Sequence, residues 1–469
     1  MLVLGIDSST QSTKALVVDA DDGAVVAEAK ASHPDGTEVN PAAWWEAARG
    51  AIAEAAERAP GRVEAVSVGG QQHGMVALDS AGEPVRDALL WNDTRSAPQA
   101  EQLVERHGAG ALASRTGLVP VASFTITKLA WLAQREPRNA DRVRRVLLPH
   151  DWVSWQLAGR PARTWTDRGD ASGTGYYSPT TGEWLPELLT EAMGGRSPEL
   201  PEVLAPDAVA ARATLPEIEG AAIGAGTGDN MAAALGLGLK PGDVAVSLGT
   251  SGAVFAPAEQ PSADPTGTVA GFCDATGRYL PLVCTLNAAR VLSSTAQLLD
   301  TDLEGLSRLA LAAEPGAGGL SLLPYLEGER TPNLPGATGT LAGLTGANMT
   351  PQNLARAAVE GMLCGMADAI DALRDTGAEV RRVLLIGGAA RSEAVQAIAP
   401  GLFGVDVDVP EPAEYVAIGA AKQAAWALSG AAGPPDWEVA GTRRTAGEDR
   451  GGEAVRAAYA AARKQAHGI

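Results

Sequence analysis

Two segments rich in hydroxyl groups and glycine have the composition of phosphate-binding turns. Residues 7–14 read Asp-Ser-Ser-Thr-Gln-Ser-Thr-Lys, and residues 247–252 read Ser-Leu-Gly-Thr-Ser-Gly. Small hydroxyl side chains and glycine let the backbone approach an anion and offer it many N–H and O–H donors. Either segment alone could be an ordinary turn, and neither is a Walker loop, since the chain contains no Gly-Lys pair. Two such turns at matching places favour a clamp on phosphate groups.

A third glycine-rich turn, at residues 224–228, ends immediately before Asp229 and a run of small residues that predicts a helix. Two interpretations of Asp229 are open. As a helix N-cap, its carboxylate would accept backbone hydrogen bonds from the first helical turn. As a general base, it would take a proton from an alcohol.

A polar loop follows the apolar run that ends at Val68, and it carries Gln72 and His73 between glycines. Amide and imidazole groups suit hydrogen bonds to the hydroxyls of a polyol, although a histidine in such a turn can also be purely structural. Residues 91–95 add the ring of Trp91, the amide of Asn92 and the acid of Asp93. These groups are typical of sugar sites, but Asp93 could equally pair with the nearby arginine on the surface.

A second strand-to-glycine transition lies near the end of the chain, where residues 383–386 run into Gly387 and Gly388. Glycine lets a flat base or a ribose approach the backbone closely. An ordinary turn between a strand and a helix is the alternative interpretation.

Two similar series of strands and helices are predicted around these residues, one in each half of the chain. Apolar runs indicate strands near residues 2–6, 15–19 and 24–30, a helix over 41–59 and a buried strand over 63–68. A strand, turn and strand at 244–255, a helix over 351–375 and a strand at 383–386 form a similar series. Two such openings, about 240 residues apart, predict a duplicated α/β unit. We place the domains at residues 1–241 and 242–469.

Composition excludes several functional classes. The chain has 469 residues, with 37 basic and 56 acidic side chains and a formal net charge of −19. This charge argues against binding to nucleic acid or to anionic membranes. The sequence has no apolar run long enough to span a membrane and no recognisable signal peptide, so a cytoplasmic protein is expected. Cys273, Cys284 and Cys364 are expected to be buried thiols rather than disulfide partners.

In this order, the motifs resemble those of the FGGY family of sugar kinases, within the actin/hexokinase/Hsp70-like fold. The resemblance covers roughly residues 1–430, and residues 123–132 and 339–360 carry the family's two signature patterns. It implies an α/β fold of two ribonuclease-H-like (actin-like ATPase) domains with a catalytic cleft between them. The first domain would hold the sugar, the first phosphate hairpin and the catalytic acid, and the second would hold the other hairpin and the adenosine.

Residues 70–74, 166–174, 284–288 and 324–332 resemble the family members that act on D-xylulose. The resemblance departs at Gln72, where these members often have methionine, so ribulose, gluconate and glycerol stay open as alternative substrates. From a different class, the chain could be a non-catalytic sugar sensor or an actin- or Hsp70-like ATPase. The presence of both Asp7 and Asp229 favours the kinase.

The resemblance also implies roles for individual residues and for two cofactors, ATP and Mg²⁺. Asp229 would accept the proton of the C5 hydroxyl of D-xylulose as that oxygen attacks the γ-phosphoryl group of ATP, and Asp7 would hold Mg²⁺. The other implied partners are small molecules, with a homodimer possible for the chain itself. The residues expected to contact the sugar are Gln72, His73, Trp91, Asn92 and Asp93. Those expected to contact the nucleotide are Thr10, Gln11, Lys14 and Thr250 at the phosphates and Gly388, Ala389 and Ser392 at the adenosine.

Overall fold

The computed structural model describes residues 1–444 and 451–469, and this part of the chain forms two compact units. The first unit comprises Met1–Leu239, Glu259–Leu280 and Glu414–Glu438. The second comprises Lys240–Ala258, Pro281–Ala413 and Val439–Ile469. The chain therefore returns twice to the first unit after leaving it.

The first unit is built on a sheet with the strand order β13-β14-β5-β1-β2-β3, in which β15 also pairs with β5. β1 runs antiparallel to β2 and parallel to β5, and β2 runs antiparallel to β3. The bounds of these strands are β1 Leu2–Ser8, β2 Ser12–Asp19, β3 Val25–Ser32, β5 Val63–Gly70, β13 Val209–Arg212, β14 Ala222–Gly224 and β15 Thr227–Gly228.

The burial pattern of these strands follows their place in the sheet. β1 and β5 are almost entirely buried, as expected for central strands covered on both faces. The edge strand β3 buries Ala27 and Ala29 but exposes Glu28 and Lys30, because successive side chains of a strand point to opposite faces. The four strands predicted from the apolar runs are confirmed as β1, β2, β3 and β5, each extended by two or three residues at one end, while β3 begins one residue later than predicted.

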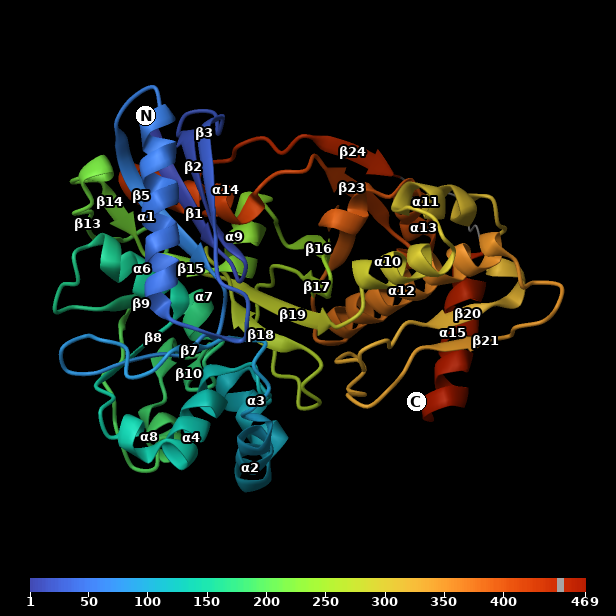
Figure 1. Cartoon of the computed structure of the whole chain (residues 1–469), viewed down its shortest axis with the longest axis horizontal. Coiled ribbons are helices and arrows are strands. Elements are labelled where there is room, and N and C mark those ends of the chain that lie inside the picture. The colour runs from blue at the N-terminus through green and yellow to red at the C-terminus, as the bar shows by residue number, and fades with distance from the viewer. Residues whose placement is uncertain (445–450) are drawn as a thin grey trace. The chain divides into compact units, whose positions relative to one another are not determined.

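Two helices cover the sheet. α1 (Pro41–Arg58) packs on β2 and β3 and buries Trp44, Ala48, Ile52 and Ala55, which are the residues spaced along one face of the predicted helix (Figure 1). α14 (Tyr415–Ser429) packs on β1 and β5 and against α9 (Asp229–Gly236).

Contacts between α14, α9 and the sheet require glycine. A Cβ atom on Gly419 would lie 1.8 Å from the carbonyl oxygen of Ala232 in α9, and one on Gly5 would lie 1.9 Å from that of Ala417. No side chain fits these gaps, since real Cβ atoms do not approach other atoms so closely. The backbones of α9, α14 and β1 are therefore in direct contact.

The second unit repeats this architecture. Its sheet contains, in this order, the strands β19-β17-β16-β22-β23-β24, with β16 antiparallel to β17 and parallel to β22. The order and directions of β19, β17, β16, β22 and β23 match those of β3, β2, β1, β5 and β14. The prediction of a duplicated α/β unit is thereby confirmed. The strands are β16 Gly242–Leu248, β17 Gly252–Phe255, β19 Tyr279–Thr285, β22 Val380–Ile386, β23 Asp406–Pro410 and β24 Gly441–Arg444.

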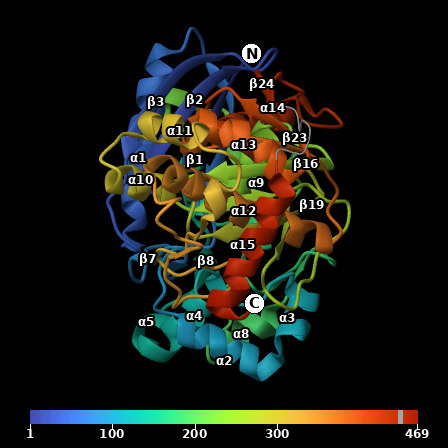
Figure 2. The ribbon, with the colours of Figure 1, turned by 90° about the vertical axis from the view of Figure 1, so that its right-hand side faces the viewer.

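The long helix of the second unit, α12 (Pro351–Asp375), matches the range predicted for it. The Thr350 side chain accepts a hydrogen bond from the Asn353 backbone N–H, and Pro351 occupies the first helical position, so the start is specified locally. α15 (Gly452–His467) packs along α12 and α13 (Figure 2). The other helices of this unit are α10 Ala289–Leu298, α11 Leu303–Leu311 and α13 Glu393–Phe403, with the short helices η2 Ala317–Gly319 and η3 Gly388–Arg391.

The remaining elements of the first unit are short helices and strands. Its further helices are α2 Ala97–His107, α3 Ala109–Thr116, α4 Thr125–Arg135, α5 Pro137–Ala140, α6 Pro149–Leu157, α7 Arg168–Ala171 and α8 Pro186–Ala192. Its further strands are β4 Glu38–Val39, β6 Val76–Leu78, β7 Ala88–Leu89, β8 Arg145–Leu147, β9 Trp165–Asp167, β10 Tyr177–Ser178, β11 Glu183–Trp184, β12 Glu202–Leu204 and β18 Ala270–Cys273.

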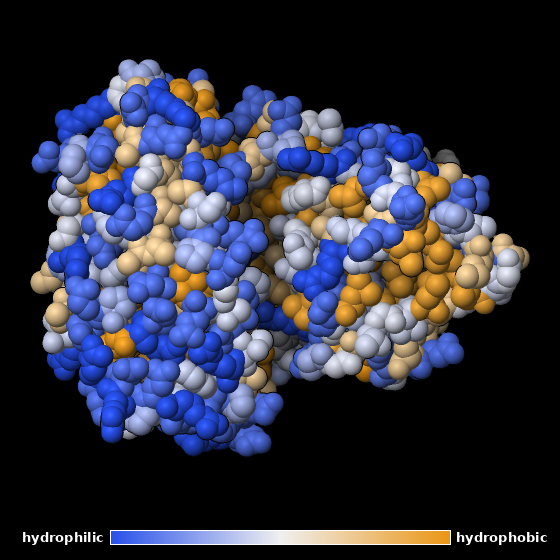
Figure 3. All heavy atoms as spheres, in the orientation of Figure 1, coloured by the Kyte–Doolittle hydropathy of each residue, from blue (hydrophilic) through white to orange (hydrophobic). Residues whose placement is uncertain are grey.

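Surface and cysteine features agree only partly with expectation. Apolar side chains gather over the α10 and α11 region of the second unit, where Leu298 and Leu303 are exposed (Figure 3). None of the three cysteines forms a disulfide, and Cys273 and Cys364 are buried as predicted. Cys284 is only half-buried, since on β19 it faces away from its buried neighbours Val283 and Thr285. Across residues 1–444 and 451–469, no helix is both long and apolar enough to cross a membrane.

Candidate active site

The predicted site residues of the first unit meet at one edge of its sheet. The parallel strands β1, β5 and β15 end together, with Asp7 paired with Gly69 and Thr227 paired with that same glycine. The turn after β1, the polar loop after β5 and Asp229 after β15 consequently leave the sheet side by side. The carboxyl ends of parallel strands are a common place for ligand sites in α/β proteins.

The hairpin formed by β1 and β2 carries the first set of phosphate-contact candidates. Asp7 and Lys14 face each other across the two strands, and the ammonium group lies 3.3 Å from a carboxylate oxygen of Asp7. Lys14 also lies 2.5 Å from the carboxylate of Glu414, immediately before α14. Burial raises the pKa of Asp7, and the Lys14 cation only partly offsets this. Burial works against the charge of Lys14, but Asp7 and Glu414 outweigh it and raise its pKa.

The turn of this hairpin is held from two sides. The indole N–H of Trp91 donates to the hydroxyl of Thr10 at 2.9 Å, which joins a predicted sugar residue to a predicted phosphate residue. His33 is hydrogen-bonded through Nε2 to the Thr13 hydroxyl at 2.8 Å, and its backbone N–H donates to the carbonyl oxygen of Gln11. The Gln11 side chain itself is exposed.

The polar loop after β5 holds His73 in a left-handed backbone conformation, with φ of 67°. Its ring is enclosed by Phe124 and Phe272, with ring centroids 5.0 and 5.4 Å away. The hydroxyl of Thr125 donates to the His73 carbonyl oxygen at 3.1 Å. A Cβ atom on Gly173 would lie 2.3 Å from the imidazole, so only glycine fits there. The surroundings therefore fix both the backbone and the ring of His73.

Asp229 is the first residue of α9, and Gly228 occupies the N-cap position. The interpretation of Asp229 as the helix N-cap is therefore wrong, because the β-strand pairing of residues 227–228 places the helix boundary one residue earlier. The carboxylate accepts hydrogen bonds from the backbone N–H of Asn230 at 2.8 Å and from its side-chain amide at 3.0 Å. Burial, followed by the charges of Asp7 and Asp170, raises the pKa of Asp229 to about 8. A carboxylate with such a pKa is suited to accept a proton near neutral pH.

Asn230 connects Asp229 to the polar loop. Its amide nitrogen also donates to the side-chain oxygen of Gln72 at 2.9 Å. The Gln72 side chain is almost fully buried, and its amide nitrogen has no hydrogen-bond partner among the residues that the structure describes. A buried donor without a protein partner is costly unless a ligand satisfies it. Gln72 thus presents a donor beside the candidate base.

Asp93 and Asn92 differ in their surroundings. Asp93 is buried and accepts hydrogen bonds from the Thr37 hydroxyl and from the guanidinium group of Arg95, both at 2.8 Å. Burial alone would raise the pKa of Asp93, but the hydrogen bonds from Arg95 and Thr37 outweigh it and lower the pKa. Asn92 is exposed.

The second unit presents its candidates at the corresponding strand ends. Thr250 is exposed in the turn between β16 and β17. Gly387 has φ of 92°, and a Cβ atom on it would lie 2.7 Å from the backbone of Leu248, so the glycine turn lies against the end of β16. Around Gly388 the space is open, whereas Ala389 is buried in η3. Ser392 is the N-cap of α13, where its hydroxyl accepts from the Val395 backbone N–H.

Sequence reasoning assigned no role to several residues that complete these contacts. Asn230 could have been predicted from the sequence, because it directly follows Asp229. Glu414 and His33 gave no local signal, since each reaches the hairpin only through tertiary packing. The same is true of His150, which lies buried behind the polar loop.

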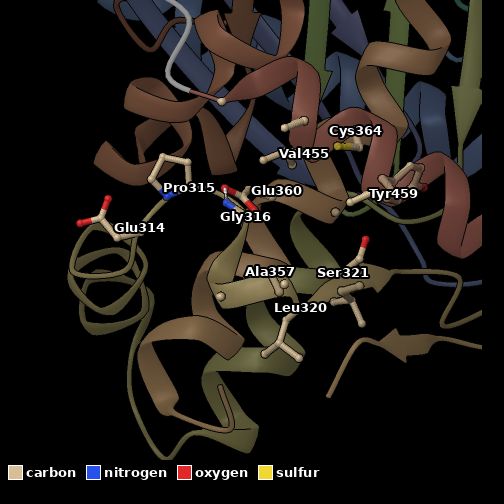
Figure 4. A pocket seen from close by; sticks show the side chains of 17 residues that line it. Glu314, Pro315, Gly316, Leu320, Ser321, Ala357, Glu360, Cys364, Val455 and Tyr459 are labelled. Carbon is tan, nitrogen blue, oxygen red and sulfur yellow. Dashed lines mark hydrogen bonds between the residues drawn. The ribbon is translucent and has the colours of Figure 1, made fainter. Parts of the chain in front are cut away.

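The second unit also contains a cavity that lies apart from these candidate residues. A cavity of about 330 Å³ in the second unit is lined by small residues and by Glu360, Cys364 and Tyr459 of α12 and α15 (Figure 4). None of the predicted site residues lines it. Within residues 1–444 and 451–469, no group of three or more His, Cys, Asp or Glu side chains is arranged to hold a metal ion by itself.

Comparisons with known proteins agree with this architecture. The sequence model of the N-terminal domain of the FGGY family of carbohydrate kinases matches residues 2–236, and that of the C-terminal domain matches residues 244–428. The chain is 49% identical to a xylulose kinase of Streptomyces coelicolor, over 92% of this chain and 88% of the relative. It is 48% identical to a xylulose kinase of Streptomyces rubiginosus, over 94% and 91% of the two chains.

Among solved structures, the crystal structure of xylulose kinase from Bifidobacterium adolescentis superposes with a TM-score of 0.90 at 45% identity, and 99% of each chain is covered. Together with the two repeated sheets, this match confirms the two-domain actin-like ATPase fold expected from the sequence. The chain belongs to the FGGY family of carbohydrate kinases.

Proposed function

We propose that this carbohydrate kinase transfers the γ-phosphoryl group of ATP to the C5 hydroxyl of D-xylulose. The observation that carries the proposal is the chain of contacts from Asp229 through Asn230 to Gln72, which sets a carboxylate with a raised pKa beside an unpartnered amide donor. Relatives named xylulose kinase at 48–49% identity support D-xylulose as the sugar.

In this mechanism Asp229 accepts the proton of the attacking hydroxyl. Its raised pKa makes proton transfer favourable near neutral pH, and such a base contributes ~10²- to 10⁴-fold to the rate. Phosphoryl transfer depends mainly on in-line positioning and on charge stabilisation. Gln72 and His73 would orient the sugar for this attack, and Trp91, Asn92 and Asp93 would border it.

The nucleotide would be held by small donors rather than by bulk charge, because the chain itself is strongly acidic. We assign the phosphates to Thr10, Gln11, Lys14 and Thr250, and the adenosine to Gly388, Ala389 and Ser392. The open space at Gly388 and the exposed hydroxyl of Thr250 support these assignments.

Asp7 would hold Mg²⁺. Mg²⁺ prefers oxygen ligands, and proteins commonly bind it through one or two carboxylates together with substrate phosphates. A single buried carboxylate, hydrogen-bonded to the hydroxyl of Ser9, fits that requirement. When bound, the ion neutralises charge on the phosphates. We place the reaction in the cytoplasm, in keeping with three cysteines that form no disulfide.

Release of ADP with a panel of polyols tests the substrate. D-xylulose should give the highest kcat/KM among D-xylulose, D-ribulose, L-ribulose, gluconate and glycerol with ATP and Mg²⁺. A higher value for another member would transfer the assignment to that sugar. ADP release that does not depend on any polyol would indicate an ATPase instead.

A further inference from the structure

His150 lies in the first turn of α6, fully buried among three carboxylates. Its Nδ1 is hydrogen-bonded to Asp170 at 2.8 Å. Its Nε2 lies 3.1 Å from Asp151 and 3.7 Å from Asp167. Asp151 has a structural task of its own, since its other oxygen accepts the Leu148 backbone N–H at the start of α6. Asp167 and Asp170 connect the imidazole to the site.

The surrounding carboxylates favour the charged form of the imidazole. Burial alone would lower the pKa of His150, but the carboxylates of Asp151, Asp170 and Asp167 outweigh it and raise the pKa to about 9. Removing one member of a buried ion cluster leaves uncompensated charge in a medium of low dielectric constant. The geometry of the cluster is therefore strongly constrained.

The cluster of His150 and its carboxylates contacts the polar loop after β5. Burial raises the pKa of Asp170, and its hydrogen bond with His150 and the nearby backbone N–H of His73 both act to lower it. At the start of this loop, a Cβ atom on Gly70 would lie 2.8 Å from Cβ of His150. Cβ and the backbone of His150 thus pack against Gly70 at the end of β5, and Asp170 lies beside His73.

The same cluster also contacts the turn of residues 226–228, which immediately precedes the candidate base Asp229. The hydroxyl of Thr227, two residues before Asp229, donates to Asp167 at 2.7 Å. Gly226 has φ of 80°, and a Cβ atom on it would lie 2.4 Å from Cδ2 of His150. The turn before Asp229 therefore packs directly on the imidazole ring.

We propose that His150 is a positioning residue. Through Asp170 and Asp167 it holds the polar loop after β5 and the turn before Asp229 in their relative places. The inference rests on the proposed roles of His73 and Asp229. His150 contacts both segments, and its carboxylate partners Asp170 and Asp167 lie beside each of them. Small displacements of reacting groups carry large kinetic costs.

Two substitutions at His150 distinguish its contact with Asp170, beside the polar loop, from its contact with Asp167, beside the turn before Asp229. In His150→Asn the amide nitrogen takes the place of Nδ1, so the hydrogen bond to Asp170 is kept while the charge beside Asp167 is lost. In His150→Gln the amide nitrogen lies near the position of Nε2, and the bond to Asp170 is lost. We expect His150→Asn to lower kcat at least ~10-fold with little change in the sugar KM. His150→Gln should raise the sugar KM at least ~10-fold.

The KM for ATP should stay within ~2-fold of wild type in both variants, because neither contact reaches the hairpin of residues 7–14. Ile52→Ala is the matched control: it opens a cavity in the α1 core of the same unit, lowers the unfolding temperature and leaves both KM values and kcat unchanged. Kinetics are compared at a temperature where all variants are folded. If either variant fails to fold, Thr227→Val removes only the hydroxyl that binds Asp167 and should still lower kcat.

Unchanged sugar kinetics in the two His150 variants, or an equal rise of both KM values, would overturn the inference. In the Thr227→Val arm, an unchanged kcat would do the same. Failure of the proposed substrate is distinguishable, because it appears in the wild-type enzyme. In that case the variants are measured with whichever polyol of the panel wild type phosphorylates.

Discussion

Asp229→Asn should abolish most of the activity and, at alkaline pH, make the protein more stable. The carboxylate titrates with a pKa of about 8 in the folded chain, against 3.8 for an ordinary aspartate. Between these values the folded chain keeps a proton that the unfolded chain has lost. Stability therefore falls as the pH rises from about 4 to about 8. Asparagine carries no charge in the folded or the unfolded state, so the stability of the Asp229→Asn variant does not fall with pH through this position.

The two pKa values set the size of the effect. At 1.36 kcal/mol for each pKa unit, the difference between 3.8 and about 8 corresponds to at most ~6 kcal/mol of destabilisation by the charged form. Asp229 keeps partial solvent exposure, and solvent screening reduces this to ~2–3 kcal/mol. Asparagine retains an oxygen that can accept the Asn230 N–H, so its geometry is conserved. Activity should fall ~10²- to 10⁴-fold through loss of the base.

Thermal unfolding of the ligand-free protein at pH 5 and pH 8.5 measures the effect. The gain in unfolding temperature for Asp229→Asn should be clearly larger at pH 8.5, because the wild-type carboxylate is charged there. Asp22→Asn, in the exposed turn after β2, is the control and should unfold like wild type at both values. The reasoning is refuted if Asp229→Asn unfolds at or below the wild-type temperature at pH 8.5. Near-normal turnover would separately refute Asp229 as the base.

Two other variants test the polar loop after β5 and the helix packing. Gln72→Ala should raise the sugar KM with little change in the ATP KM, because it removes a buried amide that is joined to the candidate base through Asn230. Steady-state kinetics with each substrate varied check this, and equal rises in both KM values would contradict the assignment. Gly419→Ala should lower the free energy of unfolding by ~3 kcal/mol or more, because its Cβ would meet Ala232 of α9 at 1.8 Å. Gly50→Ala, in open space on α1, should be neutral or stabilising by up to ~1 kcal/mol in the same denaturation experiment.

Local patterns in the sequence were enough to predict β1, β2, β3, β5, β16, β17 and β22, together with α1 and α12. The start of α12 is specified by the neighbouring residues Thr350 and Pro351, and the apolar run of β1 favours a buried strand wherever it pairs. The turn at residues 7–14 and the loop after β5 were also predictable, since glycine and hydroxyl residues act over a few positions. Of the two interpretations left open for Asp229, the helix N-cap was wrong, because strand pairing at residues 227–228 makes Gly228 the residue before the helix.

Residue types and spacing alone were enough to name the segments proposed to carry the chemistry, which are the hydroxyl-rich hairpins, the polar loop and Asp229. Which of their atoms lie in contact depends on how the strands pair and pack. Parallel pairing of β1, β5 and β15 places Asp7, Gln72 and Asp229 at one sheet edge, and this register is a property of the whole sheet. Glu414 reaches Lys14 across 400 residues of chain, and His150 gathers its carboxylates from separate elements. The physical reason is that burial of charge depends on every neighbour in space, while a sequence pattern reports only neighbours along the chain.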